Sequence, residues 1–210
     1  MTFSVAIRTV PQRKELFGAL MARLAVEPIP VPVHVSSNAD VAPNENGCLA
    51  IQKALGEPAH WILFLEDDAG LINDFFGSTE RWLKDHARPD VHVYPLGCQY
   101  PLSNDPEVTA WEYPLRSFYC SVALLIRATL APSLLAYMRC NDHVRQGFDL
   151  MTGHWHRTVS DSPHLITPVP CFVEHLGDVS TLIDGRPDKD EVGRFQCFRG
   201  FDFSYRRNGG

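Results

Sequence analysis

The chain has 210 residues, of which 45% are hydrophobic and 21% are charged, and its formal net charge is −6. This length and composition suit one domain with a sizeable core, and they disfavour extensive disorder. The negative net charge predicts no overall attraction to nucleic acid or to anionic membranes, although it is compatible with a local basic groove.

Strand-like and helix-like segments alternate along the chain, which predicts an open α/β fold. The predicted strands span residues 3–7, 31–35, 61–65, 91–96, 122–126 and 169–173. One predicted helix begins at Pro11, and the others span 48–55, 132–139 and 148–156. The third strand, WILFL, is apolar without alternation, as expected for a strand that is buried on both faces of a parallel sheet. We therefore predict a single domain in which helices flank a mainly parallel central sheet.

The sequence further predicts a cytoplasmic protein without membrane insertion. No apolar run reaches the length of a membrane span, and the N-terminus resembles a strand and turn rather than a signal peptide. The six cysteines form no CxxC pair, so neither a zinc ribbon nor a disulfide framework is indicated.

Three consecutive acidic residues, Glu66, Asp67 and Asp68, follow the WILFL strand directly. Ligands of open α/β sheets gather at the carboxyl ends of the strands. Three carboxylates repel one another there unless a cation lies among them, and Mg²⁺ or Mn²⁺ prefers such oxygen ligands. The alternative is a solvated turn or a helix N-terminus, where acidic residues are also favoured. The position after a buried strand favours the cation site.

The order of the motifs resembles the GT-A glycosyltransferases, in particular small bacterial and phage enzymes near the lipooligosaccharide glycosyltransferase family. The matching pieces, in order, are a first strand ending in Arg8, an Asn46-Gly47 turn before a helix, the acidic triplet, SFYCSVALLIRATLAPSLLAYM, Gly147-Phe148-Asp149 and PCFVEHLGDVST. The triplet reads Glu-Asp-Asp rather than Asp-x-Asp, a variant that these enzymes also use. The resemblance implies a GT-A (Rossmann-like) catalytic domain over residues 1–180, with 181–210 as a C-terminal loop or lid.

The resemblance also assigns roles to individual residues. Asp68 and His175 would ligate a Mn²⁺ or Mg²⁺ ion. The residues that would bind the nucleotide-sugar are Arg8, Thr9, Asn46, Glu66 and Asp67. The cation would neutralise the leaving diphosphate of a UDP-sugar donor.

The resemblance also implies a carboxylate beside the acceptor at about the position of Asp149. An inverting transferase needs a general base to deprotonate the acceptor hydroxyl, and Asp149 is the predicted base. The alternative for Asp149 is the N-cap of the following helix. The stereochemical outcome stays open. His154 and His156 point about 200° apart on a helix and are expected to pack or to lie on the surface. Trp155 suits either core packing or stacking on a sugar or base.

The acceptor is the least determined feature. The leading prediction is a 5-hydroxymethylpyrimidine in double-stranded phage-type DNA, and the alternative is lipopolysaccharide or another surface glycan. Six cationic residues in the last thirty favour DNA or a lid over the diphosphate, and the acidic net charge disfavours DNA. A nucleotide-binding or metal-binding protein without activity is a more distant alternative. A two-metal nuclease or phosphatase would be expected to supply further carboxylates, and the sequence has no second dense acidic cluster that is paired with a histidine.

Overall fold

The computed structural model describes residues 1–38, 40–97, 107–114, 122–141 and 147–176. Its strands are β1 (Phe3–Arg8), β2 (Val33–Ser36), β3 (Trp61–Glu66), β4 (Ala69–Leu71), β5 (Val93–Pro95), β6 (Ala110–Pro114), β7 (Ala123–Arg127), β8 (His164–Pro168) and β9 (Val173–His175). Its helices are α1 (Lys14–Ala25), α2 (Pro43–Ala54), α3 (Phe75–His86), α4 (Ala131–Cys140) and α5 (Phe148–Val159), with 3₁₀ turns at Pro11–Arg13 and Ala128–Leu130.

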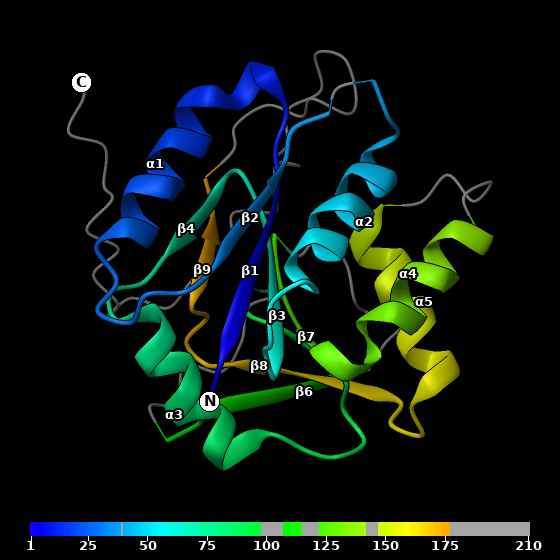
Figure 1. Ribbon diagram of the computed structural model, residues 1–210. Coiled ribbons are helices and arrows are strands. Elements are labelled where there is room, and N and C mark those ends of the chain that lie inside the picture. The colour runs from blue at the N-terminus through cyan, green and yellow to red at the C-terminus, as the bar shows by residue number, and fades with distance from the viewer. Residues whose placement is uncertain (39, 98–106, 115–121, 142–146, 177–210) are drawn as a thin grey trace, which may run out of the picture.

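The central sheet has five strands in the order β2-β1-β3-β7-β5 (Figure 1). β1 pairs in parallel with β2 and with β3, whereas β7 runs antiparallel to both of its neighbours, β3 and β5. Four of the five strands therefore share one direction. The predicted α/β class, with a mainly parallel sheet flanked by helices, is confirmed. The carboxyl ends of β1 and β3 lie at the same edge, where Arg8 is the register partner of Glu66.

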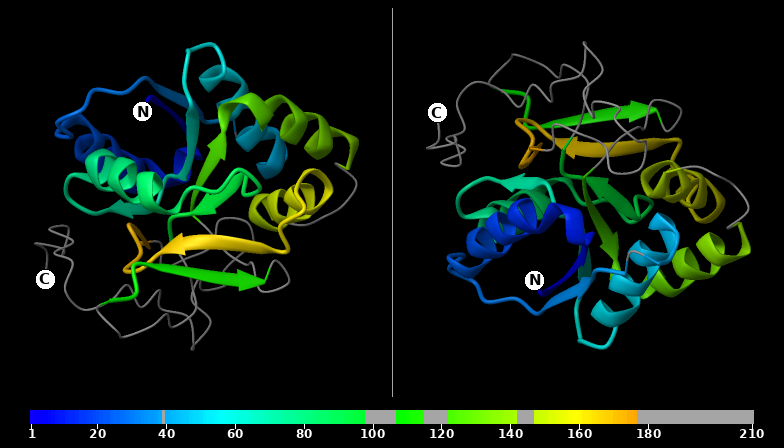
Figure 2. Two further views of the ribbon diagram at one scale, coloured as in Figure 1. Left: turned by 90° about the horizontal axis from the view of Figure 1, so that it is seen from below. Right: turned by 90° about the horizontal axis from the view of Figure 1, so that it is seen from above.

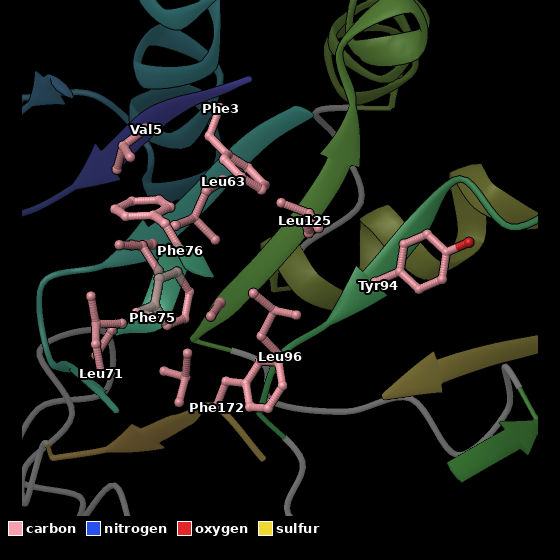
Figure 3. Packing of buried hydrophobic residues seen from close by; sticks show 14 of the residues in the cluster. Phe3, Val5, Leu63, Leu71, Phe75, Phe76, Tyr94, Leu96, Leu125 and Phe172 are labelled. Atoms are coloured by element: carbon pink, nitrogen blue, oxygen red, sulfur yellow. The ribbon is translucent and has the colours of Figure 1, made fainter. Parts of the chain in front are cut away.

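Alternate residues of β1, β3, β5 and β7 enter two separate cores. One face of the sheet packs against α1 and α3, and the other packs against α2, α4 and α5. The apolar runs of β1 and β3 supply both faces, which explains why these strands show no alternation of polarity. In Figure 3, the rings of Phe75 and Phe76 from α3 lie between Val5 and Leu63 of the sheet and Leu71 of β4.

Two small antiparallel ribbons complete the described fold. The β6–β8 ribbon lies across the central sheet from α2 and α4 (Figure 2). The β4–β9 ribbon pairs Ala69 with His175 and Leu71 with Val173. Because β4 begins one residue after Asp68, this ribbon connects the acidic triplet to a segment more than one hundred residues away.

The sequence-based element bounds need several corrections. Asn46 and Gly47 do not form a turn; they lie inside α2, which begins at Pro43 rather than at residue 48. A proline at the first helical position is favourable because its missing N–H has no partner there. The strand expected over 169–173 is replaced by β8 and β9 on either side of that segment. Helix α3 and strands β4 and β6 were not predicted.

Some predictions lie outside the described residues. The proposed lid, 181–210, and its cationic side chains fall there, as does the end of the PCFVEHLGDVST motif. Within the part that is described, no helix is long and apolar enough to cross a membrane.

Candidate functional site

The acidic triplet lies where the chain leaves β3 and enters β4. Glu66 is the last residue of β3, and Asp67 and Asp68 form the turn before β4. Asp67 and Asp68 are only 3% and 1% exposed. A fully solvated turn, which was the alternative interpretation of the triplet, is therefore wrong. Burying carboxylates is costly unless each has partners, so the contacts of each acid indicate what the site can do.

Glu66 is paired with the last residue of the neighbouring strand. Arg8 Nη2 bonds to Glu66 Oε1, and both side chains are largely buried. Burial is the main reason that the pKa of Glu66 rises to about 7; the Arg8 charge opposes this rise, and the charges of Asp68 and Asp149 add to it. Arg8 also lies over the Phe64 ring, 5.9 Å from its centroid. The predicted pair of nucleotide contacts, Arg8 and Glu66, is thus held together at the sheet edge.

Asp67 is held by the segment that follows β1. Thr9 Oγ1 donates to Asp67 Oδ2 at 2.8 Å, and the Val10 amide donates to the same oxygen at 3.3 Å. Arg13 Nη1 lies 3.2 Å from Asp67 Oδ1. Burial and the neighbouring Asp68 raise the pKa of Asp67, and the Thr9 and Arg13 hydrogen bonds limit that rise. Asp67 therefore ties β1 to the β3–β4 turn.

One oxygen of Asp68 contacts two nitrogen atoms, one from His175 and one from Arg13. His175 Nε2 lies 2.8 Å from Asp68 Oδ2, and Arg13 Nη1 bonds to that same oxygen. Burial would raise the pKa of Asp68, but the hydrogen bond and charge of His175, together with Arg13, lower it overall. Among the described residues, buried Asp68 Oδ1 has no hydrogen-bond partner. Its backbone carbonyl accepts the Leu176 amide at 2.8 Å, which extends the β4–β9 ladder by one bond.

Thr9 and Asn46 make contacts that stabilise this edge from inside the protein. Asn46 is 1% exposed, and its Nδ2 donates to the Thr9 carbonyl at 2.9 Å. Asn46 Oδ1 accepts the Asn38 amide at 3.3 Å. Thr9 is 4% exposed and uses its hydroxyl on Asp67. Direct contact of either side chain with a nucleotide stays a prediction.

Asp149 lies in the first turn of α5, and its charge acts on Glu66. The N-cap of α5 is Gly147, so the alternative interpretation of Asp149 as the N-cap is wrong. Asp149 Oδ1 accepts the Leu150 amide at 2.8 Å. Gly47 of α2 sets this position: a Cβ there would approach two Phe148 ring atoms to 2.8 Å. The first turn of α5 is thus fixed by close packing.

The side chains of Asp68 and His175 have a geometry that fits a hard divalent cation. Adjacent ligands of an octahedral ion with bonds of 2.0–2.1 Å are about 3 Å apart, and the two side-chain atoms are separated by 2.8 Å. Asp68 Oδ1, which has no hydrogen-bond partner in the described part of the chain, supplies a further acceptor. Among the described residues, no group of three or more His, Cys, Asp or Glu side chains is arranged to hold a metal. Two protein ligands suit Mg²⁺ or Mn²⁺, since such ions retain waters and take substrate phosphates.

Comparison with known proteins gives only a partial likeness. No protein-family model matches the sequence, and a comparison with curated proteins gives no match. The crystal structure of S. aureus TarS 1-349 has a TM-score of 0.47 at 14% identity, over 80% of this chain and 60% of that chain. TarS 1-349 in complex with UDP has a TM-score of 0.45 at 15% identity, with the same coverage. The chain thus spans 60% of the length of these structures, and likeness at this level says nothing of activity.

Arg13 is the site residue that the sequence analysis missed. It ends the 3₁₀ turn after β1 and contacts two of the three acids. A single arginine between a proline and a helix carries no recognisable pattern in the sequence. Only the packing of that turn against the β3–β4 turn reveals its role.

The HxH pair behaves as expected and lies apart from the triplet. His154 is exposed, whereas His156 is fully buried and stacks on His92 with ring centroids 5.7 Å apart. Neither ring nitrogen of His156 has a hydrogen-bond partner among the described residues. Burial lowers the pKa of both His92 and His156, and Asp90 opposes this in each case. Trp155 is 1% exposed and donates to Ser133, so it is a core residue rather than a stacking platform.

Proposed function

We propose that this chain is a GT-A glycosyltransferase that moves a sugar from a UDP-sugar to an acceptor hydroxyl with the help of Mn²⁺ or Mg²⁺. The observation that carries the proposal is the buried Asp68 carboxylate: one oxygen has His175 Nε2 at 2.8 Å, and the other has no hydrogen-bond partner among the residues that the structure describes. The carboxyl edge of a mainly parallel sheet is where such folds bind ligands. The motif order of the sequence supports the assignment to this family.

Each residue around the triplet has a role that its contacts allow. When bound, the cation would offset the negative charge that develops on the diphosphate as the sugar–phosphate bond breaks. Asp68 and His175 would hold that cation. Arg8 and Glu66 would face the nucleotide at the ends of β1 and β3.

Asp149 would take the proton of the acceptor hydroxyl as its oxygen forms the new bond to the sugar. Its position in the first turn of α5, close enough to Glu66 for their charges to interact, supports this assignment. The bond between the sugar and the UDP phosphate breaks as the bond between the sugar and the acceptor oxygen forms. UDP leaves, and Asp149 then passes the acceptor proton to solvent.

A donor screen that measures UDP release in Mn²⁺ tests the proposal. Asp68→Asn should reduce metal-dependent turnover by about 100-fold or more, since a bound cation supplies several kcal/mol of transition-state stabilisation. Asp74→Asn is the matched control, because Asp74 is an acid with 46% of its side chain exposed at the start of α3. Near-normal turnover in Asp68→Asn would overturn the metal-dependent mechanism.

For the acceptor, we propose a 5-hydroxymethylpyrimidine in duplex DNA. Six cationic residues in 181–210 support this choice, because phosphate contacts position a protein on DNA. The screen therefore includes hydroxymethylated duplex DNA, unmodified DNA and a lipopolysaccharide core. Sugar transfer to the lipopolysaccharide core alone would replace the DNA proposal, and nucleotide binding without turnover on any donor would favour a non-catalytic protein.

A further inference from the structure

We propose that Arg13 is a built-in counter-ion of the site: it competes with the divalent cation for Asp68 and, once displaced, binds the phosphates of the donor. This inference rests on the proposed function, because it concerns the same cation and the same donor. Neither the motif order nor the sequence pattern assigns any role to Arg13.

The contacts of Arg13 place its positive charge where the cation would bind. Arg13 Nη1 bonds to Asp68 Oδ2, the same oxygen that His175 Nε2 contacts at 2.8 Å. The Arg13 side chain is only 11% exposed. It therefore interacts with Asp68 in a weakly screened environment, where charges interact more strongly than at the surface.

A divalent ion at Asp68 cannot leave this arrangement unchanged. The ion would add two positive charges next to the guanidinium, and it would need the oxygen to which Arg13 is bonded. His175 can keep its place, because a neutral imidazole is a good ligand. Arginine cannot, because it stays protonated and has no lone pair to offer a metal.

Asp67 provides a position to which Arg13 can withdraw. Its Oδ1 already lies 3.2 Å from Arg13 Nη1, so the guanidinium can leave Asp68 without losing every acidic partner. The planar guanidinium also matches phosphate oxygens in a bidentate manner. A donor diphosphate that arrives with the cation would thus meet the released Arg13 at the edge where β1 and β3 end.

This exchange explains why buried acids are tolerated without metal. With Arg13 in place, Asp67 and Asp68 share one positive charge in addition to the His175 hydrogen bond. With the cation in place, the ion takes over that role at Asp68. Removing the Arg13 side chain should therefore lower the stability of the metal-free protein and raise its affinity for the divalent ion.

The test is a Mn²⁺ titration by calorimetry at constant pH, with wild type, Arg13→Gln, Arg13→Lys and the exposed-arginine control Arg81→Gln. We expect Arg13→Gln to bind Mn²⁺ at least ~5-fold more tightly than wild type, as for a typical coupling between sites. Arg13→Lys should fall between the two, and Arg81→Gln should match wild type. In EDTA, Arg13→Gln should melt at a lower temperature than wild type, and Mn²⁺ should raise its melting temperature more. With saturating Mn²⁺, Arg13→Gln should bind UDP more weakly.

The outcomes separate the two proposals. Equal or weaker Mn²⁺ binding by Arg13→Gln would overturn the competition while leaving the cation site intact. Unchanged UDP affinity in Arg13→Gln would overturn the phosphate contact. No Mn²⁺ binding by any of the proteins would overturn the cation site itself, and with it this inference. If Arg13→Gln does not fold, Arg13→Lys, which keeps the charge, decides the comparison with wild type.

Discussion

The ion pair between Arg23 and Glu27 allows a sharp test of how the α1 side of the fold is held together. The pair lies 2.5 Å apart, with side chains 6% and 1% exposed. Arg23 also donates to the Ile72 carbonyl, just after β4, and Glu27 Oε2 accepts the Phe76 amide at 3.2 Å near the start of α3. The two side chains therefore connect α1 to both elements that follow the acidic triplet.

Removing one partner should be far more damaging than removing both. A single substitution leaves a buried charge without its counter-ion, which typically costs about 3–5 kcal/mol. For a domain of about this size, 1 kcal/mol shifts the melting temperature by about 2–4 °C. We therefore expect Arg23→Met to lower the melting temperature by roughly 6–20 °C. Glu27→Gln should have a similar effect, although the glutamine oxygen can still accept the Phe76 amide.

The measurement is a double-mutant cycle in urea, with the double variant Arg23→Met/Glu27→Gln. The double variant should lose clearly less than the sum of the two single variants. Arg81→Met is the control, because Arg81 forms a pair with Asp74 at 2.8 Å in which both side chains are exposed, and such pairs are worth about 0–1 kcal/mol. If the buried single variants lose no more stability than Arg81→Met, the reasoning from burial is refuted.

Three further predictions concern the site and the buried histidine pair. His175→Gln should weaken Mn²⁺ binding by at least about 10-fold in a calorimetric titration, a loss seen even for partners outside the coordination shell. Burial lowers the pKa of His156, so the folded state resists protonation of this ring and the protein loses stability as the pH falls below 6.5. His156→Phe should therefore remove up to about 2 kcal/mol of the stability loss between pH 7 and pH 5, measured by urea unfolding. Gly47→Ala should lower the free energy of unfolding by up to about 2 kcal/mol. Overpacking against Phe148 costs about 1–3 kcal/mol, and the higher helix propensity of alanine offsets about 1 kcal/mol of that cost. The same substitution should also lower turnover.

The sequence predicted those parts of the fold whose pattern is local. The apolar run 61–65 indicated a strand buried on both faces, and its residues do divide between the two cores. Helix α3 was missed although Phe75, Phe76, Thr79, Trp82 and Leu83 form one buried stripe at helical spacing. Its start is hidden, because Asp74 adopts a left-handed conformation with φ 49° and provides no side-chain cap.

The sequence indicated the acids, Arg8 and His175 as candidate site residues, but it indicated neither Arg13 nor the pairing of the acids with cationic side chains. A triplet after a buried strand is visible in the sequence, and the family resemblance supplied the distant histidine. The partners of the acids come instead from packing: Arg8 is opposite Glu66 because β1 and β3 are in register. Arg13 reaches Asp67 and Asp68 because a 3₁₀ turn brings the chain back over the edge of the sheet. No local sequence pattern predicts that the 3₁₀ turn after β1 packs against the β3–β4 turn.

The β4–β9 ribbon is the structural feature on which the proposed metal site depends. Its three residue pairs, extended by the bond from the Leu176 amide to the Asp68 carbonyl, bring His175 next to Asp68 across 107 residues of sequence. So short a ladder gains little from its own hydrogen bonds, since each contributes only about 1 kcal/mol net. The buried packing of Leu71 and Val173 must therefore hold it in place. A cation bound by Asp68 and His175 would join the same two strands, so metal binding and closure of this ribbon should stabilise each other.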